Sequence, residues 1–271
     1  MTTVPTKQLS GLGTIATQNA SSVSITGGSV SGLTLVATAG VQLLSTGEIQ
    51  TIGVGNGSVS GNARGIGAID LQTSRALATQ VASGAYSFVV GSNNTANTTN
   101  AIAIGDSNVA NQVNSIVTGN QGISRYHTCH THGISGFSST AGTAQTHLVM
   151  LRGETTDATL TELLTPARWS IAANRTFVFD ILITARRAAT DDESAGFRVT
   201  GVIDRNAATT SVALVGSVTK TVLGRDHAAW DVTVDADPTL GIGSLRVRVQ
   251  GESGKTIRWV AFGRLVEVSG A

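Results

Sequence analysis

The sequence predicts an elongated all-β homotrimer, on the strength of its composition, a short internal repeat and runs of alternating apolar residues. Charged residues make up only 13% of the 271 residues, and 32 residues are glycine. Helices favour Ala, Leu, Glu, Lys and Arg, and disordered segments need high charge with low hydrophobicity. Because the composition suits neither, short strands joined by tight polar turns are the consistent interpretation.

Residues 1–52 are expected to form an extended β segment. Val23 and Ile25 stand two apart, Gly27-Gly28 follows, and Val30 resumes the alternation, a pattern of short strands and glycine turns. Residues 1–125 carry only seven charged side chains and two aromatic ones, too few for an ordinary globular core. The first five residues lack the basic and apolar regions of a signal peptide, so we expect synthesis in a cytoplasm without Sec export.

A repeat of 14 residues marks residues 53–122 as the shaft of the molecule. Gly91, Gly105 and Gly119 each end a similar short apolar run, and Asn94 and Asn108 follow the first two glycines at the same distance. Gly and Asn tolerate the positive φ that tight turns need, so each unit reads as one strand and one turn. A unit this small cannot bury its apolar face alone, and stacked units form a solenoid. We therefore predict a narrow β-roll built of such units.

Alternation within each unit predicts which side chains face the interior. The inward set is expected to be Phe88, Val90, Ile102 and Ile104, and the outward set Val89, Ala103 and Val117. The outward set is also apolar and therefore needs cover. Further copies of the chain arranged around one axis would supply that cover and protect the strand edges, which predicts a homotrimer.

Residues 123–145 are predicted to be a linker, and they contain three of the five histidines. On an extended segment, His130 and His132 point to one side. Around a threefold axis, three such pairs would present six imidazoles, a set suited to an octahedral transition ion such as Fe²⁺, Ni²⁺ or Co²⁺. The alternative is that these histidines are polar residues of a hinge, with Cys129 buried and inert.

Residues 146–271 differ in composition and are expected to form a domain with a normal core. Beyond residue 125 lie 28 of the 35 charged residues and all three tryptophans. Alternating runs such as 175–185, 196–204, 245–250 and 256–262 are separated by turn residues, which predicts an antiparallel β-sandwich resembling a jelly roll. Trp169, Trp230 and Trp259 could be platforms for sugar binding, but Trp230 and Trp259 fall within alternating runs, which favours the core.

Charge and hydropathy exclude two classes of partner. The formal net charge is +1, and no local run of Lys or Arg supplies the basic surface that nucleic-acid binding needs. The most apolar stretches fall far short of the roughly 20 residues of a membrane-spanning helix. A single cysteine, Cys129, excludes a disulfide framework within the chain.

No residue constellation indicates catalysis, so the sequence predicts a protein that is not an enzyme. No Gly-x-Ser-x-Gly elbow is present, and Cys129 beside His130 lacks a recognisable orienting residue. Asp226-His227 near Asp231 could be part of a triad, and 191–193, Asp-Asp-Glu, could bind Ca²⁺ or act as an acid and base pair. Solvated turns between strands are the simpler interpretation of both.

Several of these stretches resemble known modular families. The repeat Ala101–Asn108 resembles the head repeats of trimeric autotransporter adhesins, which form a left-handed parallel β-roll trimer. Residues 61–75, and the segment that runs from Leu151–Thr159 to Lys255–Trp259, resemble modules of tailed-bacteriophage fibre and spike proteins. Residues 12–20 are similar to fibre segments that follow a virion anchor, and the His130-x-His132 pair looks like metal-holding pairs of such fibres.

The resemblance implies a structural fibre on a virion, assembled in the host cytoplasm and exposed on the particle. Its N-terminal section would contact other virion proteins, and its C-terminal knob would contact a glycan or protein of the host surface. The sequence shows neither the signal peptide nor the outer-membrane barrel of an autotransporter, which favours the virion. A head or neck decoration fibre is the first alternative, and a bacterial adhesin or a polysaccharide-degrading tail spike is the second.

Overall fold

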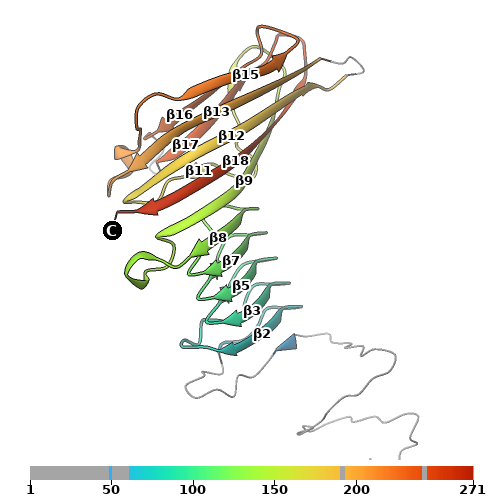
Figure 1. Ribbon diagram of the computed structural model, residues 1–271. Coiled ribbons are helices and arrows are strands. Elements are labelled where there is room, and N and C mark those ends of the chain that lie inside the picture. The colour runs from blue at the N-terminus through green and yellow to red at the C-terminus, as the bar shows by residue number, and fades with distance from the viewer. Residues whose placement is uncertain (1–48, 51–60, 190–192, 240–242, 271) are drawn as a thin grey trace, which may run out of the picture. The chain divides into compact units, whose positions relative to one another are not determined.

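The structure, a computed structural model, describes residues 49–50, 61–189, 193–239 and 243–270 (Figure 1). The expected attachment segment therefore lies almost wholly outside the described residues. All described residues belong to one compact unit. The predicted all-β class is confirmed, because the described residues contain strands and only two single-turn 3₁₀ helices, Phe137–Ser139 and Thr209–Ser211.

The described strands fall into a parallel set and an antiparallel set. The parallel set and its short side strands are β1 (Ile49–Gln50), β2 (Ile69–Ser74), β3 (Phe88–Ser92), β4 (Thr95–Ala96), β5 (Ile102–Asp106), β6 (Val109–Ala110), β7 (Ile116–Asn120) and β8 (His130–Ile134). The antiparallel set is β9 (Ala144–Thr155), β10 (Leu160–Glu162), β11 (Trp169–Ser170), β12 (Arg175–Arg187), β13 (Ser194–Arg205), β14 (Ala213–Leu214), β15 (Thr219–Arg225), β16 (Asp231–Asp237), β17 (Ser244–Gln250) and β18 (Ile257–Ser269).

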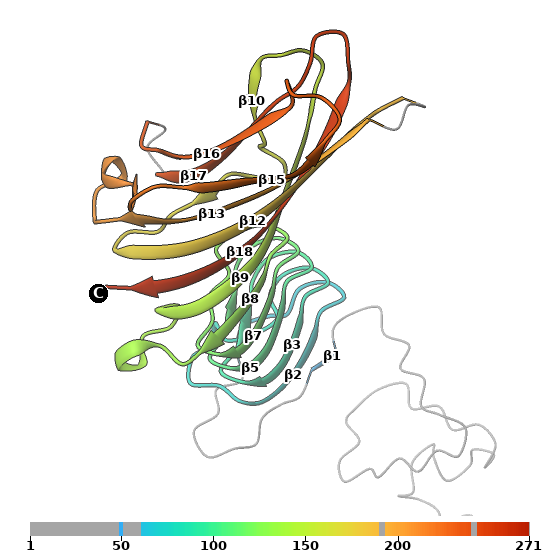
Figure 2. The same ribbon diagram turned by 45° about the horizontal axis from the view of Figure 1, so that its top comes forward.

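The predicted solenoid is present as a stack of parallel coils. Strands β2, β3, β5, β7 and β8 pair in parallel in that order (Figure 2). Gly91, Gly105 and Gly119 align across the stack, and Gly133 of β8 continues the row. Residues 130–134, which we assigned to a linker, are therefore one more coil of the solenoid. The predicted domain boundaries otherwise remain predictions.

The prediction of which side chains face inward is wrong. Val89, Ala103 and Val117 are fully buried, whereas Ile104 and Ile116 are more than one-third exposed. The interior of a coil is narrow, because two strand layers and their turns lie close together, and it admits Ala and Val rather than Phe or Ile. The bulkier apolar side chains therefore stand on the outer face of the sheet.

Buried asparagines, rather than turn geometry, explain the repeated Asn. The residues with left-handed φ at this turn are the ones that precede Asn94 and Asn108, namely Asn93 and Ser107, with φ of 54° and 56°. Asn108 is fully buried, and its Nδ2 donates to the carbonyl oxygens of Ile104 (3.0 Å) and Gly119 (2.8 Å). Its Oδ1 accepts from the backbone N–H of Gly122 at 2.8 Å. The Asn108 side chain thus links successive coils by hydrogen bonds to their backbone groups. Without Asn108, these backbone groups would lose this hydrogen-bond partner.

Gly105 shows why the repeat needs glycine. Its φ is +121°, a region that L side chains rarely adopt, and a Cβ atom would lie 2.0 Å from the carbonyl oxygen of Gly119. The aligned glycines therefore let adjacent coils approach closely at the end of each strand.

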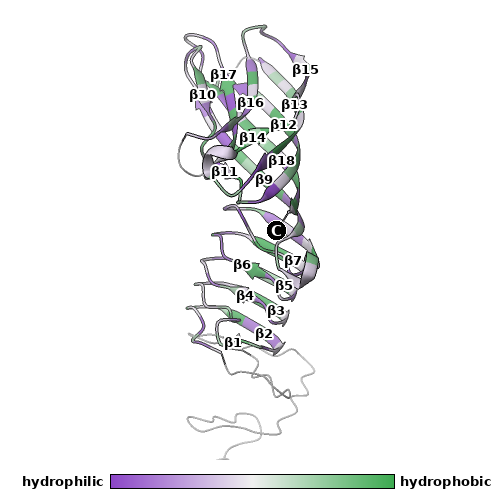
Figure 3. Ribbon diagram, turned by 90° about the vertical axis from the view of Figure 1, so that its left-hand side faces the viewer, coloured by the Kyte–Doolittle hydropathy of each residue, from purple (hydrophilic) through white to green (hydrophobic). Residues whose placement is uncertain are grey.

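The sheet continues without a break from the solenoid into the C-terminal region. β8 pairs antiparallel with β9, and the order proceeds through β18, β12 and β13, giving a sheet of 12 strands. A second antiparallel sheet, β10-β17-β11 with β16, lies against its inner face (Figure 3). One hydrophobic cluster joins the two sheets and contains all three tryptophans. We call this part the two-sheet region; its identity as a jelly-roll-like sandwich stays a prediction.

Candidate interaction face and the buried junction beside it

One face of the large sheet carries two rows of side chains that run across both parts of the molecule and are apolar except at Thr118, His130, His132 and Thr146. We call it the outer face. Strand register aligns its first row as Ile69, Phe88, Ile102, Ile116, His130 and Leu148, and its second row as Leu71, Val90, Ile104, Thr118, His132, Thr146, Val266 and Val178.

Large apolar side chains remain exposed on the outer face within the two-sheet region as well. Val178 and Val266 are 52% and 55% exposed. Further exposed members are Leu148, Met150, Leu182, Val260 and Val268. Most inward positions of the same strands are apolar as well, so both faces of this sheet carry apolar side chains, as is typical of a sheet that is covered on both sides. Exposed apolar side chains that gather on one face in this way are typical of an interaction surface.

A charged group interrupts the apolar rows in the two-sheet region. Arg198 donates from Nε to Oδ1 of Asp180 at 2.8 Å, and Arg264 also donates to the Asp180 carboxylate. The hydrogen bond from Arg198 holds the pKa of Asp180 below its usual range. Beside this group lies a hollow of about 370 Å³, lined on its apolar side by Leu148, Val178 and Val266.

The two predicted metal-binding residues lie on the same outer face. His130 and His132 are both exposed and project from β8 on one side, as expected of alternate strand residues. The Thr118 hydroxyl lies 3.2 Å from His130 Nε2 and 3.0 Å from His132 Nδ1. Within the part of the chain that the structure describes, no group of three His, Cys, Asp or Glu side chains comes together to hold a metal ion. One chain alone therefore supplies two imidazoles.

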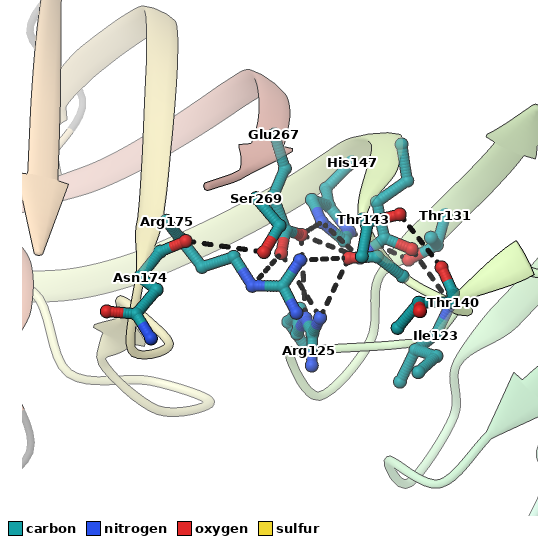
Figure 4. Close-up of polar contacts among 12 residues, drawn as sticks. Ile123, Arg125, Thr131, Thr140, Thr143, His147, Asn174, Arg175, Glu267 and Ser269 are labelled. Atoms are coloured by element: carbon teal, nitrogen blue, oxygen red, sulfur yellow. Dashed lines mark hydrogen bonds and ion pairs between the residues drawn. The ribbon is translucent and has the colours of Figure 1, made fainter. Parts of the chain in front are cut away.

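A buried polar junction lies where the solenoid meets the two-sheet region (Figure 4). The Glu267 carboxylate accepts from Gln145 Nε2 at 2.6 Å, lies 2.7 Å from His147 Nε2 and pairs with Arg125 at 3.2 Å. Arg175 approaches the same carboxylate at 3.5 Å. Charged and polar groups from the last coil and from three strands of the two-sheet region thus converge on one carboxylate.

Burial and hydrogen bonding set the protonation of the junction. Burial opposes the charged form of Glu267, but the hydrogen bond with His147 and the charge of Arg125 together hold its pKa below the usual range. Burial lowers the pKa of His147, although its hydrogen bond with Glu267 opposes that shift. A neutral imidazole can donate from Nε2 to Glu267 and accept at Nδ1 from the Thr131 hydroxyl, 2.8 Å away.

The remaining thiol and phenol near the junction are inaccessible. Cys129 is buried with its sulfur 3.6 Å from the Thr131 hydroxyl, and burial raises its pKa. Burial likewise raises the pKa of Tyr126, whose ring packs edge-on to His147. A thiol that is buried and protonated is a poor nucleophile.

In the structure, each residue that could have formed a triad has a different partner. Asp226 accepts from the backbone N–H of Ser194, Asp231 pairs with Lys220, and His227 lies 2.7 Å from Glu193. The hydrogen bond from Lys255 holds the pKa of Glu193 below its usual range. Two of the three acidic loop residues, 191–192, lie outside the described residues.

Trp169, Trp230 and Trp259 are all buried, which confirms the core positions expected for the last two and removes them as exposed sugar platforms. In the described ranges, no helix is long and apolar enough to cross a membrane.

Comparisons with known proteins give only distant structural likenesses. No known family model and no curated protein matches the chain. Among solved structures it is similar to the tailspike protein gp49 from Acinetobacter baumannii bacteriophage Fri1, a capsular polysaccharide depolymerase, with a TM-score of 0.29 and 10% identity. The match covers 76% of this chain and 38% of that protein. A likeness this distant assigns no activity or substrate to this chain.

The prediction that the chain is not an enzyme is nevertheless corrected by this finding. The protein that the comparison brings up is itself named as a polysaccharide depolymerase. The sequence contained no recognised catalytic motif, but that lack does not exclude catalysis by residues that only the fold brings together. The exclusion of enzymatic activity therefore does not stand.

Proposed function

We propose that the chain is the shaft and head of a receptor-binding spike or fibre on a bacteriophage particle, assembled as a homotrimer. The observation that carries this proposal is the unbroken sheet from the solenoid through β9 into the two-sheet region. A continuous hydrogen-bonded sheet leaves no hinge between its two parts, so it can hold a head at a set position. The resemblance of residues 61–75 and 151–159 to phage modules supports the virion as its place.

In this proposal, the N-terminal section contacts other virion proteins and the two-sheet region contacts a glycan or protein of the host surface. Three heads on one shaft raise the effective concentration of weak binding sites without any new contact. Assembly takes place in the host cytoplasm and requires neither a membrane span nor nucleic acid.

Labelling of intact particles tests the proposal. Gold-conjugated antibody against the purified chain is expected to decorate particles of the phage that carries the gene, and unlabelled particles would contradict it. Purified chain should also compete with particle adsorption to host cells. Labelled particles without competition would favour the head or neck decoration fibre, and cleavage of host polysaccharide by the purified chain would identify a degrading tail spike.

We also propose that His130 and His132 of three chains hold one transition-metal ion such as Fe²⁺, Ni²⁺ or Co²⁺. The exposed imidazoles of one chain already project to the same side, and imidazole suits these ions. Elemental analysis of purified wild-type trimer should find about one ion per three chains, and the variant His130→Ala should lose it. A content well below one ion per trimer in the wild type would contradict the proposal.

A further inference from the structure

We infer that the outer face of the large sheet is the surface on which the copies of this chain meet, with three outer faces turned toward one axis and the chains parallel and level. This inference rests on the homotrimer of the proposed function and names its interface. It places the exposed apolar rows of β3, β5 and β7, and those of β9, β18 and β12, in contact with the same rows of two further copies.

The spacing of the rows identifies the partner that packs against the outer face as a second copy of this chain. Each coil advances the stack by one strand, about 4.8 Å, and presents two outward side chains. Both are apolar on β2, β3 and β5, and one is apolar on β7. Register aligns Ile102 with Ile116 and Val90 with Ile104, so the rows repeat at every coil. A surface that packs against every coil must have the same spacing and the same direction. A parallel copy of this chain meets both conditions over the whole length of the stack.

The width of the face suits a threefold arrangement. Strands β3, β5 and β7 have five residues each, about 17 Å, and show only two outward positions before the glycine. Both positions are apolar on β3 and β5, and β7 carries Ile116 and Thr118 there. When three copies surround one axis, the coils at one level bring two outward side chains each, six in all, to that axis. A face as narrow as this one can supply them. The larger side chains, Ile104 and Ile116 among them, stand on this face and not inside the coils, and they are the ones that need cover.

In the two-sheet region, the outer face likewise carries apolar residues and a hollow. Val178, Val266 and Leu148 line the hollow of about 370 Å³, which can accept side chains from a neighbouring copy. The Asp180 carboxylate is already paired with Arg198 and Arg264 on the same chain, so an interface there leaves no unpaired acid.

The opposite surface of the two-sheet region differs from the outer face, because the described residues of β16 and β17 expose no large apolar side chain. On β16 and β17, Asp235 pairs with both Arg246 and Arg248, and Arg168 pairs with Glu162 and with Asp237. This charged surface is typical of a solvated sheet face. The contrast between the two surfaces of one head singles out the outer face as the one that is covered.

Site-directed cross-linking tests the face independently of host binding. Ile104→Cys on a Cys129→Ala background is expected to form covalent dimers on mild oxidation, because the three introduced thiols would meet near the axis. Thr233→Cys on the same background is the matched control, since Thr233 is exposed on β16 of the opposite surface, and it should form none.

A charge substitution gives a second readout. Val178→Asp is expected to reduce the mass in light scattering from three times 27.6 kDa to 27.6 kDa, with an unchanged far-ultraviolet circular dichroism spectrum, whereas Thr233→Asp stays trimeric. A wild-type trimer in which Ile104→Cys does not cross-link and Val178→Asp stays trimeric overturns the interface alone. A wild-type chain that is monomeric at every concentration overturns the interface and the homotrimer together. Failure of particle labelling bears only on the virion proposal.

Discussion

The buried Asn108 amide offers the sharpest test of how the solenoid is held together. Replacing Asn108 with Ala removes three hydrogen bonds of 2.8–3.0 Å to backbone groups of Ile104, Gly119 and Gly122. A buried polar group that loses its partner costs about 1–3 kcal/mol. Because three groups are affected, and because their costs are not fully additive, we expect Asn108→Ala to lower the free energy of unfolding by roughly 3–5 kcal/mol.

Denaturant unfolding at one fixed chain concentration measures this effect, since association makes stability depend on concentration. Asn97→Ala is the matched control, because Asn97 is exposed in a neighbouring coil and its substitution should change stability by less than about 0.5 kcal/mol. If Asn108→Ala is as stable as Asn97→Ala, the asparagines do not hold the coils together and the account of the repeat is wrong.

Three further predictions concern the junction, the core and the glycine row. The pKa of Glu267 is lower in the folded chain than in the unfolded chain, so its charged form stabilises the fold above the pKa of an unfolded glutamate. This stability should be lost as the pH falls through the lower folded pKa. The substitution Glu267→Gln should flatten that part of a plot of stability against pH. An unchanged curve would contradict the role of the junction. Trp259→Phe removes the 3.0 Å bond from Nε1 to the buried Thr155 hydroxyl and should cost about 1–3 kcal/mol in denaturant unfolding; full wild-type stability would refute it. Gly105→Ala should yield little folded protein, because its Cβ atom would lie 2.0 Å from a carbonyl oxygen, and a normal yield of folded trimer would show that the coils are looser than described.

The solenoid was predictable because its signal is local. Gly91, Gly105 and Gly119 repeat within 28 residues, and each unit contains both its strand and its turn. The same spacing reaches Gly133, and this signal was sufficient to predict the last coil. The last coil was nevertheless missed, because His130 and His132 stand at outward positions where the earlier units carry Ile and Val.

The direction of the side chains was not predictable from alternation alone. Both sets of positions are apolar, so hydrophobicity does not separate them, and side-chain size decides instead. Ala103 fits the narrow interior, whereas Ile104 does not. An alternation of small and large apolar residues in a short repeat is therefore the signal that places the small residues inside.

The junction lay beyond sequence reasoning for a different reason. Arg125 and Glu267 are 142 positions apart, and only the pairing of β9 with β18 brings them together. One local signal was present. Gln145 and His147 occupy the inward positions of β9, where an apolar residue is expected, and buried polar residues at such positions need partners.

Electron cryomicroscopy of the purified, full-length chain tests the central claim most directly. The account predicts a map with threefold symmetry in which the rows containing Ile104 and Val178 face the axis, and in which β16 and β17 face solvent. A map of a single chain, or a trimer whose outer faces are turned to solvent, would contradict it.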